Sequence, residues 1–269
     1  MQSRRVRVYA QGPGIGDALW LTALAKNFKH QRPKDEFIPV TSHPEIFKYN
    51  PDIYTSLTFE EDNEIGDGEK VGLNFDVKTH AIDGYCKQLG LSPPFIRRNF
   101  IYLTEKEIEI ASRKLHSSLR IIAVQSQAGP WTRNKDWIHE RFEEVITYFR
   151  SGGYRCLQIG GDEDKRLGEC VDFFGSVREV AALMSRCKLF IGPVSAGMHI
   201  ASAVGIPAVI VFGGREDPNV ITLENHFPIY TKMECSPCWR VEPCQNKTCM
   251  ENIYSHTVIE IAELILSKQ

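Results

Sequence analysis

The sequence lacks a long apolar segment and has no marked excess of charge of either sign. No apolar run approaches the roughly 20 residues that a membrane-spanning helix needs, and the run at 6–10 is too short for a signal peptide. The 32 basic and 34 acidic residues give a net charge of −2, so no broad field attracts nucleic acid or an anionic membrane surface. We expect a cytoplasmic protein with no membrane span and no nucleic-acid partner, which binds any anion locally.

Short β-branched segments alternate with amphipathic helical patterns along the chain, and this alternation predicts parallel sheets in an α/β fold. The polar stretch Phe59 to Glu64 is typical of a solvated loop. Strands are expected at 5–10, 36–41, 71–77, 121–125, 156–159, 189–191 and 208–212.

A length of 269 residues with 42% hydrophobic content favours two modest domains over one. We predict a short N-terminal domain over 1–110 and a second domain over 111–255, which includes a cysteine-rich segment at 235–249. A final helix over 256–269 is expected to pack back on the N-terminal domain.

The first strand leads into a glycine loop with Gly12, Gly14 and Gly16. Their G-x-G-x-G spacing differs from the G-x-G-x-x-G of dinucleotide-binding folds, which weakens an oxidoreductase interpretation. Glycines still let the backbone approach a ligand closely, and the following helix start favours negative charge. Asp17 at this helix start has two interpretations, a first-turn acid that stabilises the helix dipole or a general base.

An ordered series of motifs resembles glycosyltransferase family 9, which contains the ADP-heptose:lipopolysaccharide heptosyltransferases. The match begins at 12–19 with Thr22 and spans most of the chain. Its later pieces are Trp131 to Trp137, Gly160-Gly161, Ser195 to His199, Gly205-Ile206-Pro207, Phe212-Gly213 and Asp217-Pro218. The resemblance implies a GT-B fold, in which two Rossmann-like domains face a central cleft, with the acceptor on the first and the nucleotide sugar on the second.

The resemblance also implies an inverting transfer that requires no metal ion or other cofactor for catalysis. Asp17 would be the base that takes the proton of the acceptor hydroxyl. Thr132 and Lys135 would reach the donor phosphates, where a cation offsets the charge of the departing diphosphate. The alternative for Lys135 is a solvated surface residue. The strand-to-helix turn would hold the pyrophosphate through Ser195, Ala196, Gly197 and His199.

The chain departs from the family pattern in one place. The family has an aspartate where this sequence has Val194, which removes a carboxylate from the donor pocket. Ribose recognition would then fall to a carboxylate after Gly160-Gly161, and Asp162, Glu163 and Asp164 are equal candidates.

The eight cysteines include four that cluster near the C-terminus as C-x2-C and C-x4-C, namely Cys235, Cys238, Cys244 and Cys249. This spacing suits a closed tetrahedral thiolate site for a structural Zn or Fe. Two disulfides, which a cytoplasmic location disfavours, and unliganded thiols are the alternatives.

The sequence therefore predicts an inverting glycosyltransferase that uses a nucleoside-diphosphate sugar. The resemblance favours ADP-heptose as the donor, and a hydroxyl of lipopolysaccharide or of a protein as the acceptor. The competing hypothesis is a nucleotide-sugar-binding protein of the same fold that has lost catalysis.

Overall fold

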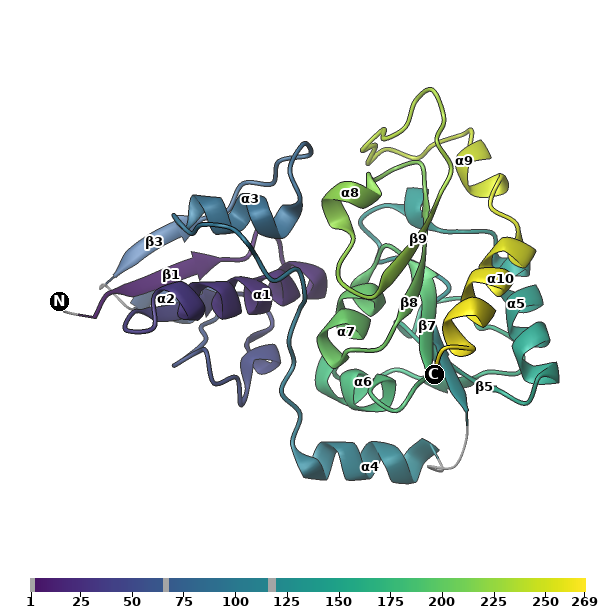
Figure 1. The fold of residues 1–269 in the computed structure, drawn as a ribbon, viewed down its shortest axis with the longest axis horizontal. Helices are drawn as coiled ribbons and strands as arrows, with labels where there is room; N and C mark the ends of the chain where they lie inside the picture. The colour runs from purple at the N-terminus through teal and green to yellow at the C-terminus, as the bar shows by residue number, and fades with distance from the viewer. Residues whose placement is uncertain (1–2, 65–67, 116–119) are drawn as a thin grey trace. The chain divides into compact units, whose positions relative to one another are not determined.

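A computed structural model describes residues 3–64, 68–115 and 120–269. The chain divides into two compact units, Met1–Thr104 and Glu105–Gln269, and each is described by itself (Figure 1). Both contain a parallel sheet covered by helices, which confirms the predicted α/β class. Within the described ranges, no helix has both the length and the apolar character required to cross a membrane.

The first unit is built on a parallel sheet in which β1 (Arg5–Tyr9) lies between β2 (Glu36–Val40) and β3 (Glu69–Gly72). The β-branched residues Val6 and Val8 of β1 are buried. Its helical segments are α1 (Ile15–Gln31), η1 (Pro44–Phe47), α2 (Phe59–Glu64) and α3 (Ala81–Gln88). Helix α1 packs on β2, η1 and α3, so the glycine loop that precedes it is held at the carboxyl end of β1.

The third strand is shorter and begins earlier than the predicted 71–77. β3 spans Glu69–Gly72, and its register with β1 pairs Glu69 with Val6 and Gly72 with Tyr9. Because β1 ends at Tyr9, residues after Gly72 have no strand to pair with. The apolar pattern of the sequence continues beyond Gly72, but β1 offers no further backbone groups for hydrogen bonds there.

The stretch predicted as a solvated loop is the helix α2 (Phe59–Glu64). Thr58 and Glu61 form reciprocal hydrogen bonds at its start, from Thr58 N to Glu61 Oε2 at 2.7 Å and from Glu61 N to Thr58 Oγ1 at 3.2 Å. This is a capping box, which nucleates a short helix. Asp62 is buried and lies 3.0 Å from Arg7 Nη1 of β1, so an ion pair ties α2 to the sheet.

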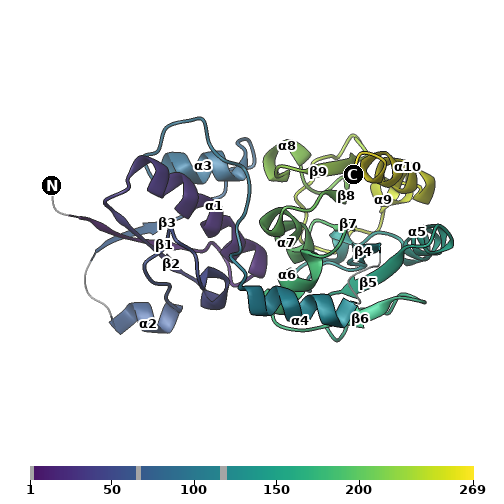
Figure 2. The same cartoon turned by 60° about the horizontal axis from the view of Figure 1, so that its bottom comes forward.

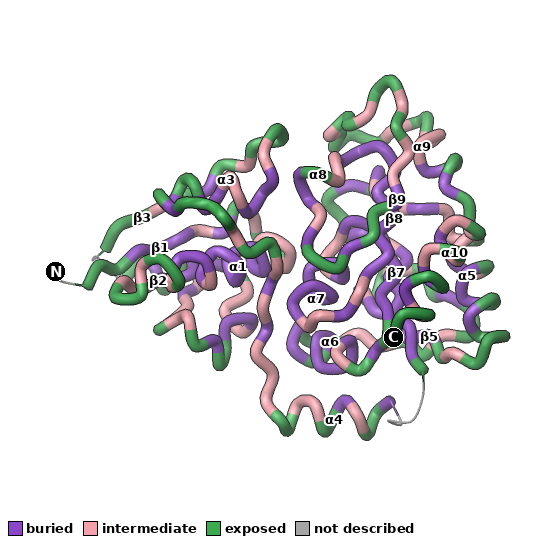
Figure 3. The backbone as a smooth tube through the Cα atoms, viewed as in Figure 1, coloured by how far each residue is buried: buried purple, intermediate pink, exposed green. Residues whose placement is uncertain are grey.

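The second unit contains a six-stranded parallel sheet in the order β6-β5-β4-β7-β8-β9. The interior strands β4, β7 and β8 are buried along their whole length, which Figure 3 shows for β7 and β8, as expected for a sheet covered on both faces. The strands are β4 (Ile121–Val124), β5 (Arg155–Ile159), β6 (Val171–Phe173), β7 (Leu189–Pro193), β8 (Ala208–Gly213) and β9 (His226–Tyr230).

Helices cover both faces of this sheet (Figure 2). On one face α6 packs on α4 and α7, and α7 packs on β7 and β8, whereas on the other α5 packs on α10 and β5. The helical segments are α4 (Glu105–Leu115), η2 (Arg133–Lys135), α5 (His139–Ser151), α6 (Val177–Met184), α7 (Ala196–Val204), α8 (Pro218–Ile221), α9 (Thr248–Glu251) and α10 (Ser255–Leu266).

The C-terminal helix α10 belongs to the core of the second unit. Its apolar residues Val258, Ala262 and Ile265 are buried in one cluster with residues of α5, β4 and β8. This helix was expected to pack back on the N-terminal domain, but the structure buries these three residues in the second unit. The period of an amphipathic helix indicates which side is buried, but it carries no information about which sheet buries it.

Candidate functional site

The sheet of the second unit has a topological switch point between β4 and β7, where the strand order changes direction. The chain runs from β4 through β5 to β6 at one edge, and then from β7 through β8 to β9 at the other. Loops that leave the carboxyl ends of β4 and β7 therefore turn away from each other, and open α/β sheets bind ligands at such a switch point. Lys135 follows β4, Ser195 follows β7, and Glu216 follows the next strand β8.

A cluster of charges joins two of these loops. Lys135 Nζ lies 2.7 Å from Glu216 Oε1, and Arg215 Nη1 lies 2.7 Å from the same oxygen. The exposed fraction of the Lys135 side chain is 16%, and those of Arg215 and Glu216 are 4% and 5%. Two cations around one carboxylate leave a net positive charge in a shielded place, where it acts more strongly on an anion than in water.

Trp131 lies over both cations of this cluster. Lys135 Nζ is 5.4 Å, and Arg215 Cζ is 4.6 Å, from the centre of its rings. The indole is 64% exposed, so an aromatic face sits at the solvent side of the buried charges. Cation–π contacts of this kind help to fix the cations in position.

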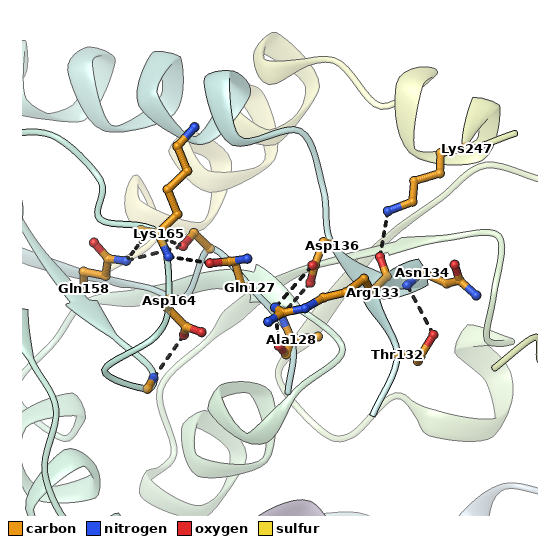
Figure 4. Close-up of polar contacts among 12 residues, drawn as sticks. Gln127, Ala128, Thr132, Arg133, Asn134, Asp136, Gln158, Asp164, Lys165 and Lys247 are labelled. Carbon is orange, nitrogen blue, oxygen red and sulfur yellow. Dashed lines mark hydrogen bonds and ion pairs between the residues drawn. The ribbon is translucent and has the colours of Figure 1, made fainter. Parts of the chain in front are cut away.

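The predicted phosphate loop is bonded to the cysteine-rich segment. Thr132 is buried, donates from Oγ1 to the carbonyl of Val241 at 2.9 Å and accepts from Asn134 N at 3.3 Å. Asn134 donates to the carbonyls of Arg240 and Glu242 at 3.1 and 2.7 Å, and Figure 4 shows the turn formed by 132–136. The proton of the Thr132 hydroxyl is thus used within the protein, whereas Lys135 Nζ keeps donors for a ligand.

The turn from β7 to α7 brings Ser195, Ala196 and Gly197 to the same edge of the sheet. Ser195 is the N-cap residue, and its side chain makes no capping bond. The N–H of Gly197 donates to Gln125 Oε1 at 3.1 Å, and a Cβ there would lie 2.5 Å from Phe190 Cζ. Glycine is therefore required by packing, and one of the helix-start N–H groups is already satisfied within the protein.

His199 is buried in the first turns of α7, and it is neutral at physiological pH. Burial, together with electrostatic interactions with His226 and Lys135, lowers the pKa of His199 to about 3. Burial likewise lowers the pKa of His226 to about 4. His226 accepts from Leu223 N at Nδ1, so its Nε2 carries the proton and donates to the carbonyl of Met198 at 3.1 Å. His199 therefore supplies no positive charge to a bound phosphate.

The three candidate ribose ligands after β5 have different surroundings. Asp164 Oδ2 accepts from Gly161 N at 3.0 Å (Figure 4), and a Cβ at Gly160, whose φ is +154°, would overlap that carboxylate. Asp164 therefore stabilises its own turn. Asp162 and Glu163 are exposed, which leaves their carboxylates accessible to a ligand.

In the first unit the glycine loop wraps around the carboxylate of Asp17. Gly14 N donates to Asp17 Oδ2 at 3.2 Å, and Cβ atoms at Gly12 and Gly14 would lie 3.0 and 2.8 Å from this oxygen. These two glycines thus allow the carboxylate to approach the backbone. Gly16 lies inside α1.

Tyr85 of α3 lies near this carboxylate. Its hydroxyl donates to Gln11 Oε1 at 2.8 Å, and burial, assisted by the charge of Asp17, raises its pKa. A neutral phenol and an amide thus accompany Asp17 in the first unit.

The four clustered cysteines do not form a metal site in this conformation. Over the described ranges, no group of three or more His, Cys, Asp or Glu side chains is arranged to hold a metal ion. Cys235 and Cys238 are exposed, and Cys244 Sγ donates to the carbonyl of Asn246 at 3.0 Å. Burial raises the pKa of Cys249, and the Cys238 and Cys235 thiols nearby raise it further. The structural metal stays a prediction.

Sequence reasoning missed Arg215, Glu216 and the cation contacts of Trp131. A signal was available, because Arg215 and Glu216 follow Gly213-Gly214 directly after the apolar run of β8. Charged residues that follow a buried strand of a parallel sheet lie at its ligand-binding edge.

Comparison with protein families identifies one family whose model covers most of the second unit. The model of "Glycosyltransferase family 9 (heptosyltransferase)" matches residues 101–254, more than half of the chain. No curated protein matches the chain in sequence.

Several solved structures share the fold across both units. A family 9 glycosyl transferase from Veillonella parvula DSM 2008 has a TM-score of 0.80 at 18% identity, over 100% of this chain and 98% of that one. The ADP-heptose lps heptosyltransferase II of E. coli has a TM-score of 0.76 at 13% identity, over 98% of this chain and 99% of that one. The iron-containing dodecameric glycosyltransferase TibC of enterotoxigenic E. coli has a TM-score of 0.75 at 16% identity, over 100% of this chain and 77% of that one. These likenesses establish the GT-B fold with two Rossmann-like domains.

Proposed function

The chain belongs to glycosyltransferase family 9, and we propose on this premise that it transfers a heptose or hexose-like sugar, with inversion, from a nucleoside-diphosphate donor to a hydroxyl group. ADP-heptose is the proposed donor. The observation that carries this proposal is the shielded, net positive cluster of Lys135, Arg215 and Glu216 at the loops after β4 and β8. A diphosphate is the anionic group that such a cluster suits.

In the proposed reaction Asp17 accepts the proton of the acceptor hydroxyl. The acceptor oxygen forms a bond to the anomeric carbon from the face opposite the diphosphate, and the bond between this carbon and the phosphate oxygen breaks. The electron pair leaves with the nucleoside diphosphate. Lys135 and the start of α7 then stabilise the added negative charge, while Asp162 or Glu163 accepts hydrogen bonds from the ribose.

The acceptor is proposed to be a hydroxyl of lipopolysaccharide or of a protein. The structural relatives include a lipopolysaccharide heptosyltransferase and TibC, a glycosyltransferase that was solved with ADP-D-β-D-heptose. Incubation of the enzyme and labelled ADP-heptose with heptose-deficient lipopolysaccharide core, or with an unmodified protein acceptor, separates the two.

The proposal is tested by a thermal-shift screen with ADP-, GDP-, UDP- and CDP-sugars, followed by measurement of nucleoside-diphosphate release. We expect the ADP-sugar to raise the melting temperature most, because a ligand that binds only the folded state stabilises it. We also expect slow release of ADP by hydrolysis. Binding without release, even with acceptors, would contradict catalysis, and the absence of any stabilisation would contradict the donor site itself.

A further inference from the structure

The two carboxylate oxygens of Glu216 have different environments. Lys135 Nζ and Arg215 Nη1 each lie 2.7 Å from Oε1. Oε2 is buried and has no hydrogen-bond partner among the residues that the structure describes. Glu216 itself is only 4% exposed, so bulk water does not supply a donor to this oxygen.

A buried carboxylate oxygen without a donor costs free energy, since it has lost water and gained no replacement. Folded proteins contain few such atoms, and an unsatisfied one commonly marks the place of a bound molecule or water. The missing group must be a hydrogen-bond donor. Phosphate oxygens of a nucleotide sugar are acceptors at neutral pH, so the diphosphate cannot bond to Oε2, whereas a hydroxyl group can.

The strand order indicates which hydroxyl this is. Asp162 and Glu163 follow β5, Lys135 follows β4, and Glu216 follows β8, on the far side of β7. With the nucleoside at the β5 side and the diphosphate over the β4 and β7 loops, the remaining part of the donor extends toward β8. That part is the transferred sugar, and its ring carries several hydroxyl groups.

We propose that Glu216 is a specificity-determining residue of the donor site, whose Oε2 accepts a hydrogen bond from a hydroxyl of the transferred sugar. This inference rests on the proposed function. In the donor complex Lys135 binds the diphosphate through its remaining donors, and Trp131, whose indole is 64% exposed, lies at the solvent side of the cluster. Glu216 remains fixed by Arg215, which also donates to the carbonyl of Arg240 at 2.7 Å.

The alternative is that Glu216 only positions Lys135. The two roles differ in their effect on the sugar-free ligand, because ADP contains the diphosphate and the ribose but no transferred sugar. A sugar-binding Glu216 affects ADP-heptose alone, whereas a residue that positions Lys135, or one that binds ribose, affects ADP and ADP-heptose equally.

The experiment is calorimetric titration of the full chain and of Glu216→Gln with ADP and with ADP-heptose. Glutamine keeps the shape but is a weaker acceptor, so the dissociation constant for ADP-heptose should rise about tenfold. The dissociation constant for ADP should stay the same or decrease, because the substitution removes a negative charge near the diphosphate. Glu224→Gln makes the same charge change at an exposed position beyond α8 and should alter neither constant.

Glu216→Asp keeps the charge but withdraws the carboxylate by one methylene, and it should show the same selective loss for ADP-heptose. Circular dichroism and melting temperature establish that each variant is folded. Parallel weakening of ADP and ADP-heptose, or no weakening of either, would overturn the role of Glu216 and leave the proposed function intact. If the unmodified chain binds neither ligand, the proposed donor fails, and this inference fails with it.

Discussion

The backbone N–H of Gly14 donates to Oδ2 of Asp17 at 3.2 Å, so the proposed base is held by the loop that precedes its helix. This bond fixes the carboxylate without neutralising it. Asp17 is also the third residue of α1, where an acid stabilises the helix dipole. One residue can therefore serve both as a cap and as a base, and the two roles are separable by experiment.

Asp17→Asn should retain donor binding and lose turnover by roughly two to four orders of magnitude, because a positioned base is removed while the hydrogen-bonding shape is kept. Titration with ADP-heptose and a transfer assay measure the two quantities. The free energy of unfolding should fall by less than about 1 kcal/mol from the lost dipole interaction. Near-normal turnover would leave Asp17 only its role at the helix start.

Lys135→Ala should weaken diphosphate binding and reduce turnover further, by about 2 to 4 kcal/mol in the transition state. A nucleoside without phosphates should bind the variant and the original protein alike. Lys188→Ala removes a charge at the opposite end of β7 and is the matched control. Equal diphosphate affinity and turnover in Lys135→Ala would leave this lysine only its ion pair with Glu216.

Adding Glu216→Gln to Lys135→Ala should restore part of the diphosphate affinity. Removal of the lysine alone leaves the buried Glu216 carboxylate with one cation fewer, close to the negative charge of the ligand. The double-mutant cycle should therefore show coupling of about 1 to 3 kcal/mol. Additive effects of the two substitutions on ADP affinity would contradict an electrostatic link between the two side chains.

The purified protein should contain about one equivalent of Zn or Fe bound by Cys235, Cys238, Cys244 and Cys249, by analogy with structural thiolate sites. Cys238→Ser should lower the melting temperature, because thiolate ligation is coupled to folding, and Cys187→Ser, at a buried cysteine outside the cluster, should leave the metal content unchanged. Elemental analysis without metal, together with unchanged stability in chelator, would favour free thiols.

The free energy of unfolding should decrease as the pH falls from 6.5 toward 4. The pKa values of His199 and His226 are lowered in the folded protein, to about 3 and about 4, whereas unfolded histidine takes up its proton near pH 6.5. The unfolded state thus binds more protons in this window, and each histidine contributes a loss of about 1.4 kcal/mol per pH unit.

Urea unfolding at pH 7.5 and 5.0 measures this loss. His226→Asn should be less stable than the unmodified protein at pH 7.5. Its free energy of unfolding should decrease less between pH 7.5 and pH 5.0. His30→Gln, at an exposed position of α1, should follow the unmodified protein. The same pH-dependent loss in His226→Asn would contradict the assignment.

The sequence predicted what depends on local periodicity and on motif order. The alternation around 121–212 predicted β4, β5, β7 and β8 of the parallel sheet in the second unit. Gly12 and Gly14 were expected to let a ligand approach the backbone, and in the structure they let the carboxylate of Asp17 approach it. The end of β3 was missed because a strand ends where its partner ends, which its own residues do not encode. Glu216 was missed because its importance arises from Lys135, 81 positions away along the chain, and only the fold brings them together.

The bonds between the β4 loop and the cysteine-rich segment have a thermodynamic consequence. Thr132 and Asn134 donate to carbonyls at 240–242, and Cys244 N donates back to Asn134 Oδ1 at 2.9 Å. Two segments that share these bonds are ordered together, so an event at one changes the free energy of events at the other, and by reciprocity the changes are equal. A donor bound beside Lys135 should therefore change the affinity of Cys244 for a reversible thiol ligand by the same factor by which that ligand changes the affinity for the donor.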